Sequence, residues 1–97
     1  MVAALGVIGY SHFFARRFDE AVPNLLLTIQ GDESYAQPYR ALAACYAHMG
    51  RLDEARATAA RLRTIAPLLM PDVSYLRRSE DRELLLSGLQ LAIGGVN

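Results

Sequence analysis

Cys45 and His48 stand three residues apart in a run of alanines that predicts a helix, so their side chains can meet on one helical face. A thiol beside an imidazole can act as a nucleophile, but catalysis also needs a group that orients the imidazole and a site that stabilises an oxyanion. The sequence contains no glycine-rich phosphate loop and no nucleophile elbow. It therefore favours a small buried cysteine over a catalytic pair, and we predict no enzyme activity.

His12, Cys45 and His48 are also residue types that bind zinc. Their spacing matches no zinc motif, and His12 occupies the position that Tyr46, an expected core residue, holds 34 residues later. We therefore predict no metal and no cofactor.

The charges exclude several classes of partner. Ten basic and ten acidic residues leave the 97-residue chain with no net charge, so it has no general attraction to nucleic acid or to an anionic membrane. The arginines of residues 51–63 could form a basic strip. However, the acids come early and the arginines late in this predicted helix, which the helix dipole explains by itself.

The composition also indicates in which cellular compartment the protein resides. No apolar run reaches the ~20 residues that span a bilayer, and the apolar start at residues 1–10 lacks the basic residues of a signal peptide. The single cysteine excludes an internal disulfide and fits a reducing compartment. We expect a cytoplasmic protein that binds neither nucleic acid nor membrane.

The sequence repeats itself with an offset of 34 and no gaps. Residues 17–21 (RFDEA) align with residues 51–55 (RLDEA). Ala21 and Ala55 are small enough for two helices to cross closely. The repeat therefore predicts one helical hairpin that occurs twice in succession.

The turn of that hairpin is clearest in the second copy. Gly50 can adopt the left-handed conformation that ends a helix. Asp53 and Glu54 then lie in the first turn of the next helix, where negative charge faces the positive end of the dipole. Arg16 takes the place of the glycine in the first copy.

These signals predict helices over residues 2–15, 18–30, 34–48 and 52–65. We expect Pro23 to bend or weaken the second helix, Ser34 and Gln37 to form a capping box, and Pro67 to end the fourth helix. A short helix at 72–78 and a last helix at 79–91 follow. Their predicted apolar face consists of Leu76, Leu84, Leu85, Leu89 and Ile93.

With its period of 34, the chain resembles the tetratricopeptide repeat (TPR) family over roughly residues 3–67. The second copy carries the family pattern at Tyr39, Leu42, Ala43, Tyr46, Gly50, Ala55 and Pro67. The first copy carries it at Leu5, Ile8, Gly9, His12 and Ala21, with Arg16 and Glu33 in place of the usual glycine and proline. The resemblance implies an all-α, right-handed α-solenoid in one domain, with repeats at 2–33 and 34–67 and capping helices at 68–97.

The tail also resembles a narrower group. Residues 81–89 (DRELLLSGL) are similar to the C-terminal end of TPR regions attached to bacterial class III adenylate cyclases. These residues are not part of a cyclase catalytic domain, so the similarity implies no cyclase activity.

The TPR resemblance implies a function as a protein interaction module, because the first helix of each pair lines a concave face that holds a peptide or a partner helix. On this chain that face consists of Val7, Tyr10, Phe13, Phe14, Gln37, Arg40, Ala44, Ala47 and His48. The aromatic residues of this set could equally form core or pack on another copy. Arg40 alone suits the carboxylate-binding positions of the family, so we do not expect capture of C-terminal carboxylates.

Two repeats and a cap make a thin core, because about three repeats are needed for stability. We therefore predict self-association, with a dimer as the simplest case. The alternative function is a structural homo-oligomerisation element, or the C-terminal regulatory fragment of a larger bacterial signalling protein.

Overall fold

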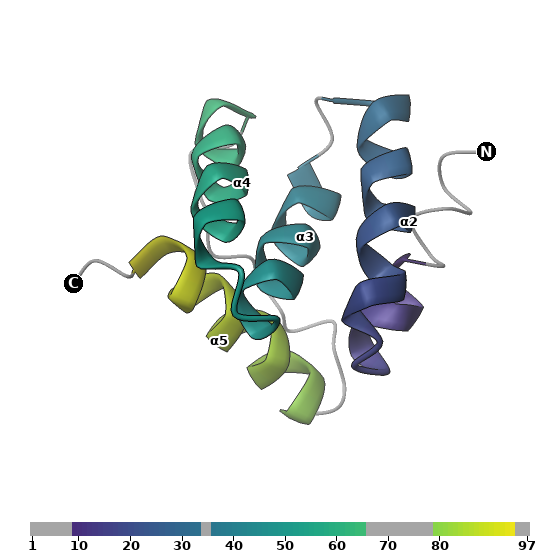
Figure 1. Cartoon of the computed structure of the whole chain (residues 1–97), viewed down its shortest axis with the longest axis vertical. Helices are drawn as coiled ribbons and strands as arrows, with labels where there is room; N and C mark the ends of the chain where they lie inside the picture. The colour runs from purple at the N-terminus through teal and green to yellow at the C-terminus, as the bar shows by residue number, and fades with distance from the viewer. Residues whose placement is uncertain (1–8, 34–35, 66–78, 95–97) are drawn as a thin grey trace.

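The computed structural model describes residues 9–33, 36–65 and 79–94. All regular structure in these ranges is helical: residues 9–14, then α2 (Phe18–Gly31), α3 (Ala36–His48), α4 (Leu52–Ile65) and α5 (Ser79–Gly94). Helices α2, α3 and α4 lie side by side and alternate in direction, while α5 runs obliquely across α3 and α4 (Figure 1). This arrangement confirms the all-α class built from helix-turn-helix units.

The helix bounds follow the predictions closely. α4 has the predicted bounds, α2 ends one residue later than predicted, at Gly31, and α5 continues past Leu91 to Gly94. α2 runs on through Pro23, whose side chain is exposed. Four predictions lie outside the described residues: the start of the first helix, the Ser34 cap, the stop at Pro67 and the helix at 72–78.

The two hairpins turn in the same way. Arg16 and Gly50, which are 34 residues apart, both adopt the left-handed conformation, with φ of 64° and 80°. In each turn, the backbone N–H of the residue after the left-handed one donates to the carbonyl oxygen five residues before it, with an N–O distance of 2.8 Å. This is the longer-range of the two hydrogen bonds in a Schellman motif. These bonds join Arg17 to His12 and Arg51 to Tyr46.

We expect Arg16→Gly to stabilise the fold by about 0.5–1 kcal/mol. The left-handed conformation costs a non-glycine residue about 1–2 kcal/mol, and the greater freedom of glycine in the unfolded chain offsets part of the gain. Urea unfolding followed by circular dichroism measures the change.

Gly50→Ala is the matched reverse change and should destabilise the fold by about 1 kcal/mol. Nothing lies within 4 Å of the Cβ that it would add, so only the backbone conformation contributes. A loss of stability in Arg16→Gly would contradict the equivalence of the two turns.

The core of each hairpin repeats with the same offset. Ala21 and Ala55 are fully buried, as close helix crossing requires. At Gly9, an added Cβ would lie 2.8 Å from the Leu25 side chain, so the first helix and α2 also approach closely. Four further core positions were not predicted from the sequence. The offset of 34 pairs Leu25 with Ala59 and Thr28 with Leu62, and all four are at most 3% exposed.

Helix α5 is amphipathic and packs against α3 and α4. Its buried side consists of Leu84, Leu85, Leu89 and Ala92, with Ile93 packed beside them. Its exposed side carries Glu80, Glu83, Ser87 and Gln90, and also Leu91, which is 48% exposed. An apolar inner side and a mostly polar outer side suit a helix that covers the end of a repeat stack.

Candidate partner-binding face

The predicted concave face divides into buried and accessible parts. Val7 lies outside the described residues. Phe13 and Ala44 are fully buried and Ala47 is 5% exposed, so these three do not line an open groove. The remaining residues are half-buried: Tyr10, Phe14, Gln37, Arg40 and His48.

Helix α5 covers the C-terminal half of the predicted face on α3. A Cβ added to Gly88 would lie 2.6 Å from the Ala44 Cβ and 2.8 Å from the Ala44 Cα, so the two backbones nearly touch. The His48 Nε2 donates to the Leu84 carbonyl oxygen at 2.7 Å. Gln37 and Arg40, one to two turns earlier on α3, therefore remain as the accessible part of this stripe.

The aromatic residues of the first helix form a cluster with α2. The Phe13 ring meets the Phe14 ring edge-on at 4.9 Å and the Phe18 ring at 5.8 Å. Phe18 in turn stacks on the His48 ring at 5.3 Å. Phe13 is thus a core residue, which corrects its assignment to the binding face, while Tyr10 stacks on Phe14 at the margin of the cluster.

Cys45 and His48 both lie in the packed interface of α3 with its neighbouring helices. Cys45 is fully buried, and burial raises the pKa of its thiol to about 12. His48 bonds to Leu84 and stacks on Phe18. Since a thiolate is the reactive form of cysteine, this environment suppresses nucleophilic chemistry.

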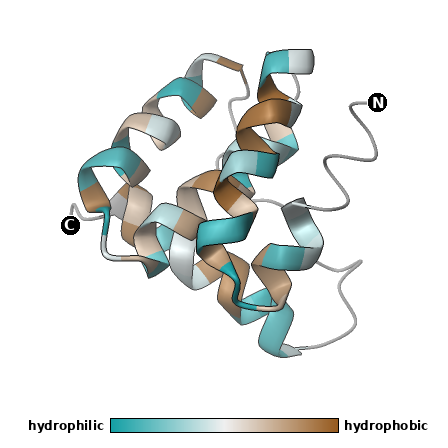
Figure 2. Cartoon of the chain, turned by 45° about the vertical axis from the view of Figure 1, so that its right-hand side comes forward, coloured by the Kyte–Doolittle hydropathy of each residue, from teal (hydrophilic) through white to brown (hydrophobic). Residues whose placement is uncertain are grey.

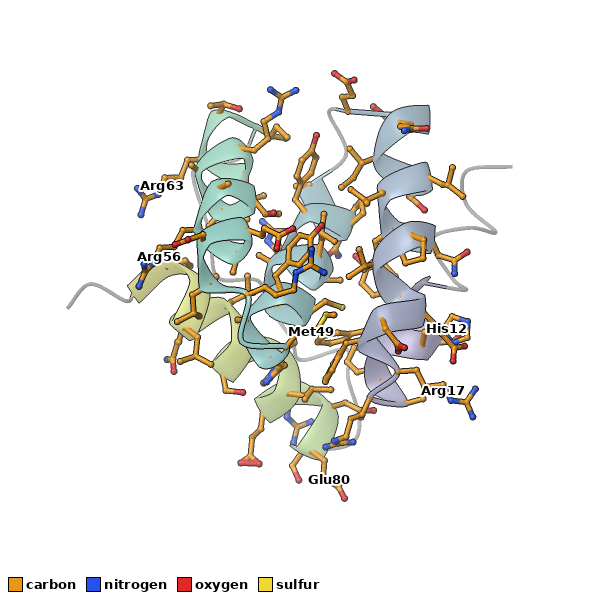
Figure 3. The ribbon with its side chains drawn as sticks, in the orientation of Figure 1. His12, Arg17, Met49, Arg56, Arg63 and Glu80 are labelled. Carbon is orange, nitrogen blue, oxygen red and sulfur yellow. The ribbon has the colours of Figure 1, made fainter. Side chains whose placement is uncertain are left out.

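The third candidate ligand, His12, lies apart from the other two. Its Nδ1 lies 3.6 Å from a Glu20 carboxylate oxygen, and its side chain points outward beside Arg17 in Figure 3. Within the described residues, no group of three or more histidine, cysteine, aspartate or glutamate side chains could hold a metal ion.

Because Cys45 is buried, we expect the stability of the fold to depend on pH in the alkaline range. The folded thiol, with its pKa raised to about 12, keeps its proton where an unfolded thiol, with a pKa near 9.0, loses it. The free energy of unfolding should therefore fall between about pH 9 and about pH 12, by up to about 1.4 kcal/mol per pH unit. Urea unfolding at a series of pH values measures this slope.

Cys45→Ala is the control, because it removes this proton and should flatten the slope. At neutral pH, Ellman's reagent should label folded Cys45 only as fast as the chain opens. Rapid labelling of the folded protein would contradict the buried environment and would support a reactive, catalytic cysteine instead.

The arginines of α4 do not form a single strip. Arg51 pairs with Glu54 through two hydrogen bonds and lies over the Tyr46 ring at 5.0 Å. Arg61 reaches Glu33 at 3.5 Å. Arg56 and Arg63 project from another side of α4, away from the bundle (Figure 3).

A second surface, which the sequence analysis missed, lies between α2 and α4. It is a shallow groove of about 340 Å³ lined by Leu26, Ile29, Glu33, Tyr39, Leu42, Ala57, Thr58 and Arg61. Figure 2 shows an apolar stretch in this part of α2, where Leu26 is 40% exposed. Leu42 and Arg40 are two residues apart, about 200° around the helix, so this groove and the predicted face lie on opposite sides of α3.

None of the described helices is long and apolar enough to span a membrane.

Comparison with protein families gives a match to the tetratricopeptide repeat over residues 15–79. No curated protein and no solved structure matches the chain. The matched region contains both left-handed turns, α2, α3 and α4, and it ends where α5 begins. The chain belongs to the tetratricopeptide repeat family.

Proposed function

We propose that this chain is a non-catalytic protein interaction module that binds a peptide or a partner domain on the inner side of its helix pairs. The observation that carries the proposal is the family match over residues 15–79, since repeats of this family generally serve as protein interaction modules and are typically non-catalytic. The repeated turn geometry supports it, because it folds both helix pairs alike, and α2 packs against α3 so that the pairs stack as such a surface requires.

Within this proposal, the partner contacts the part of the inner face that α5 does not cover. Gln37 and Arg40 offer an amide and a guanidinium on α3, and Tyr10 and Phe14 offer half-buried rings on the first helix. Half-buried rings and a few polar groups on the same inner face suit a peptide with one or two large apolar side chains. Arg40 adds a preference for an acidic group in that peptide.

Selection from a displayed peptide library, followed by affinity measurement, tests this function. We expect selected peptides to lose at least about tenfold in affinity for Arg40→Glu, which is worth about 1.4 kcal/mol. Arg63→Glu is the matched control, because Arg63 is exposed and points away from the bundle (Figure 3). Equal losses in the two variants, or no peptide that binds, would contradict the proposal.

The alternative is a homo-oligomerisation element, with a dimer as the first expectation. Exposed leucines favour it: Leu26, Leu27 and Leu91 are 40–48% exposed. Light scattering after size exclusion, across a dilution series, separates a stable dimer from a monomer of 10.7 kDa.

Three further proposals come from the sequence. The chain is one cytoplasmic domain, with repeats at 2–33 and 34–67 and a cap at 68–97. The similarity of residues 81–89 to the TPR regions of class III adenylate cyclases adds a bacterial signalling protein as the proposed context. The family match ends at residue 79 and so does not extend to this segment.

A further inference from the structure

We propose that the groove between α2 and α4 binds an amphipathic helix of a partner protein, which presents two large apolar side chains and, at its N-terminal end, a lysine or arginine. The inference goes beyond the proposed function, because this groove and the inner face lie on opposite sides of α3. It gives the chain a second surface for a partner, of different chemistry from the first.

The groove offers an apolar surface whose hydroxyl groups are already engaged within the chain. The Tyr39 hydroxyl donates to the Glu33 carbonyl oxygen at 3.0 Å. The Thr58 hydroxyl donates to the Glu54 carbonyl oxygen at 2.8 Å. Leu26, which lines the groove, is 40% exposed. An occupant therefore gains most from this surface by burying apolar side chains against it.

The walls of the groove have the length of a short helical segment. On α2 the lining residues Leu26, Ile29 and Glu33 follow the spacing i, i+3, i+7. They therefore share one face of the helix over about 10 Å, at 1.5 Å per residue. On α4, Ala57 and Arg61, one turn apart, belong to the facing wall. Helices that dock into apolar grooves place their anchor side chains at this same spacing, so a helix fits the groove in register.

The charges at one end of the groove favour a basic group. Asp32 and Glu33 directly follow α2, whose last turn contains no basic residue to balance the negative end of its dipole. Arg61 offsets one of these charges through a contact of 3.5 Å with the Glu33 carboxylate. The Arg61 and Glu33 side chains are 60% and 69% exposed, so a ligand can reach this carboxylate. Two acids and a helix C-terminus against one arginine make this end of the groove negative.

The same charges determine the direction of the bound helix. α2 and α4 run parallel to each other and end on the same side of the molecule (Figure 1). A helix whose N-terminus lies at this end runs antiparallel to both walls, so its positive dipole end faces the negative end of α2. A lysine at its position i then meets Glu33, and leucines at i+3 and i+7 lie level with Ile29 and Leu26.

Titration of the full-length chain with a defined peptide tests the assignment. The probe is an alanine-rich helical peptide with lysine at i and leucines at i+3 and i+7, and its twin has glutamate in place of the lysine. We expect the lysine probe to bind at least about threefold more tightly than its twin at low salt. Leu26→Asp should lower the affinity for the lysine probe at least about tenfold, since it places a charge in the apolar groove.

Leu27→Asp is the matched control. Leu27 adjoins Leu26 on α2 and is 48% exposed, but it does not line the groove. It should change the affinity by less than about twofold, as expected for a surface site outside the contact. Circular dichroism of both variants checks that their helices are intact.

Glu33→Lys tests the charge separately and should make the glutamate twin the tighter ligand. The proposal is overturned if neither probe binds, if the wild-type chain does not prefer the lysine probe, or if the two leucine variants lose equal affinity. A dimer in light scattering that Leu26→Asp dissociates and Leu27→Asp does not would assign the groove to a second copy, and would also overturn it.

The experiment separates this groove from the inner face. The lysine probe has no acidic group for Arg40, so Arg40→Glu should leave its affinity unchanged. Leu26→Asp should likewise leave the affinity of Arg40-dependent peptides unchanged. Failure of either surface to bind its ligand therefore leaves the other proposal standing.

Discussion

Phe13→Ala is expected to lower the free energy of unfolding by about 3–5 kcal/mol. Phe13 is fully buried, and its ring packs against Phe14 and Phe18, so truncation removes apolar contacts and leaves a cavity between the first helix and α2. A domain of this size has a total stability of roughly 5–15 kcal/mol. The variant should therefore lose a large part of its helicity on mild heating, which circular dichroism measures.

Phe14→Ala is the control, because Phe14 neighbours Phe13 on the same helix but is only half-buried. Its loss should be about 1–2 kcal/mol, in keeping with partial burial. If Phe13→Ala instead kept its stability and abolished peptide binding, Phe13 would belong to the binding face and not to the core.

Gly88→Val should detach α5 from α3 or cost about 2–3 kcal/mol if α5 stays in place. The new Cβ would lie 2.8 Å from the Ala44 Cα, which is a backbone atom and cannot move aside as a flexible side chain can. Since valine forms helices slightly better than glycine, any loss comes from the packing of α5 and not from its propensity. Urea unfolding, with hydrogen exchange along α5, separates detachment from uniform destabilisation.

Ser87→Val is the matched control for this change. Ser87 is exposed and adjoins Gly88 in the same helix, so valine there meets solvent. It should change the free energy of unfolding by less than about 0.5 kcal/mol. Equal effects at the two positions would contradict the close approach of α5 and α3.

The hairpins could be predicted because local signals and the repeat agree. Gly50 and the Asp-Glu pair that follows mark the turn and the next helix start in one copy, and the offset of 34 transfers them to the other. Arg16 is the informative case, because its residue type disfavours the left-handed conformation that it nevertheless adopts. This conformation of Arg16 was not predicted, and the only sequence signal for it is its offset of 34 from Gly50.

The core positions on the second helix of each pair were harder to find. Leu25 and Thr28 align with Ala59 and Leu62, so the side-chain sizes change between copies. Thr28 is buried although it is polar, because its hydroxyl donates to the Asn24 carbonyl oxygen at 3.0 Å. A hydrogen bond from a side chain to the backbone of its own helix cannot be recognised from the hydrophobic pattern of the sequence.

The accessible part of the binding face could not be predicted, because it depends on where α5 docks. The spacing of Leu84, Leu85 and Leu89 predicts an apolar side, but it does not say which helix this side covers. That choice depends on the shape of the Ala44 surface and on His48, which lie about 40 residues earlier in the chain. Their contacts with Gly88 and Leu84 explain why half of the predicted face is covered.

The most direct test of the central claim is a map of backbone amide shifts when a selected peptide is titrated into the labelled chain. Binding to the inner face predicts shifts at Tyr10, Gln37 and Arg40, with little change at Leu26 and Arg61 across the molecule. Shifts confined to the groove between α2 and α4 would contradict the claim, since they would place the partner on the opposite side of α3.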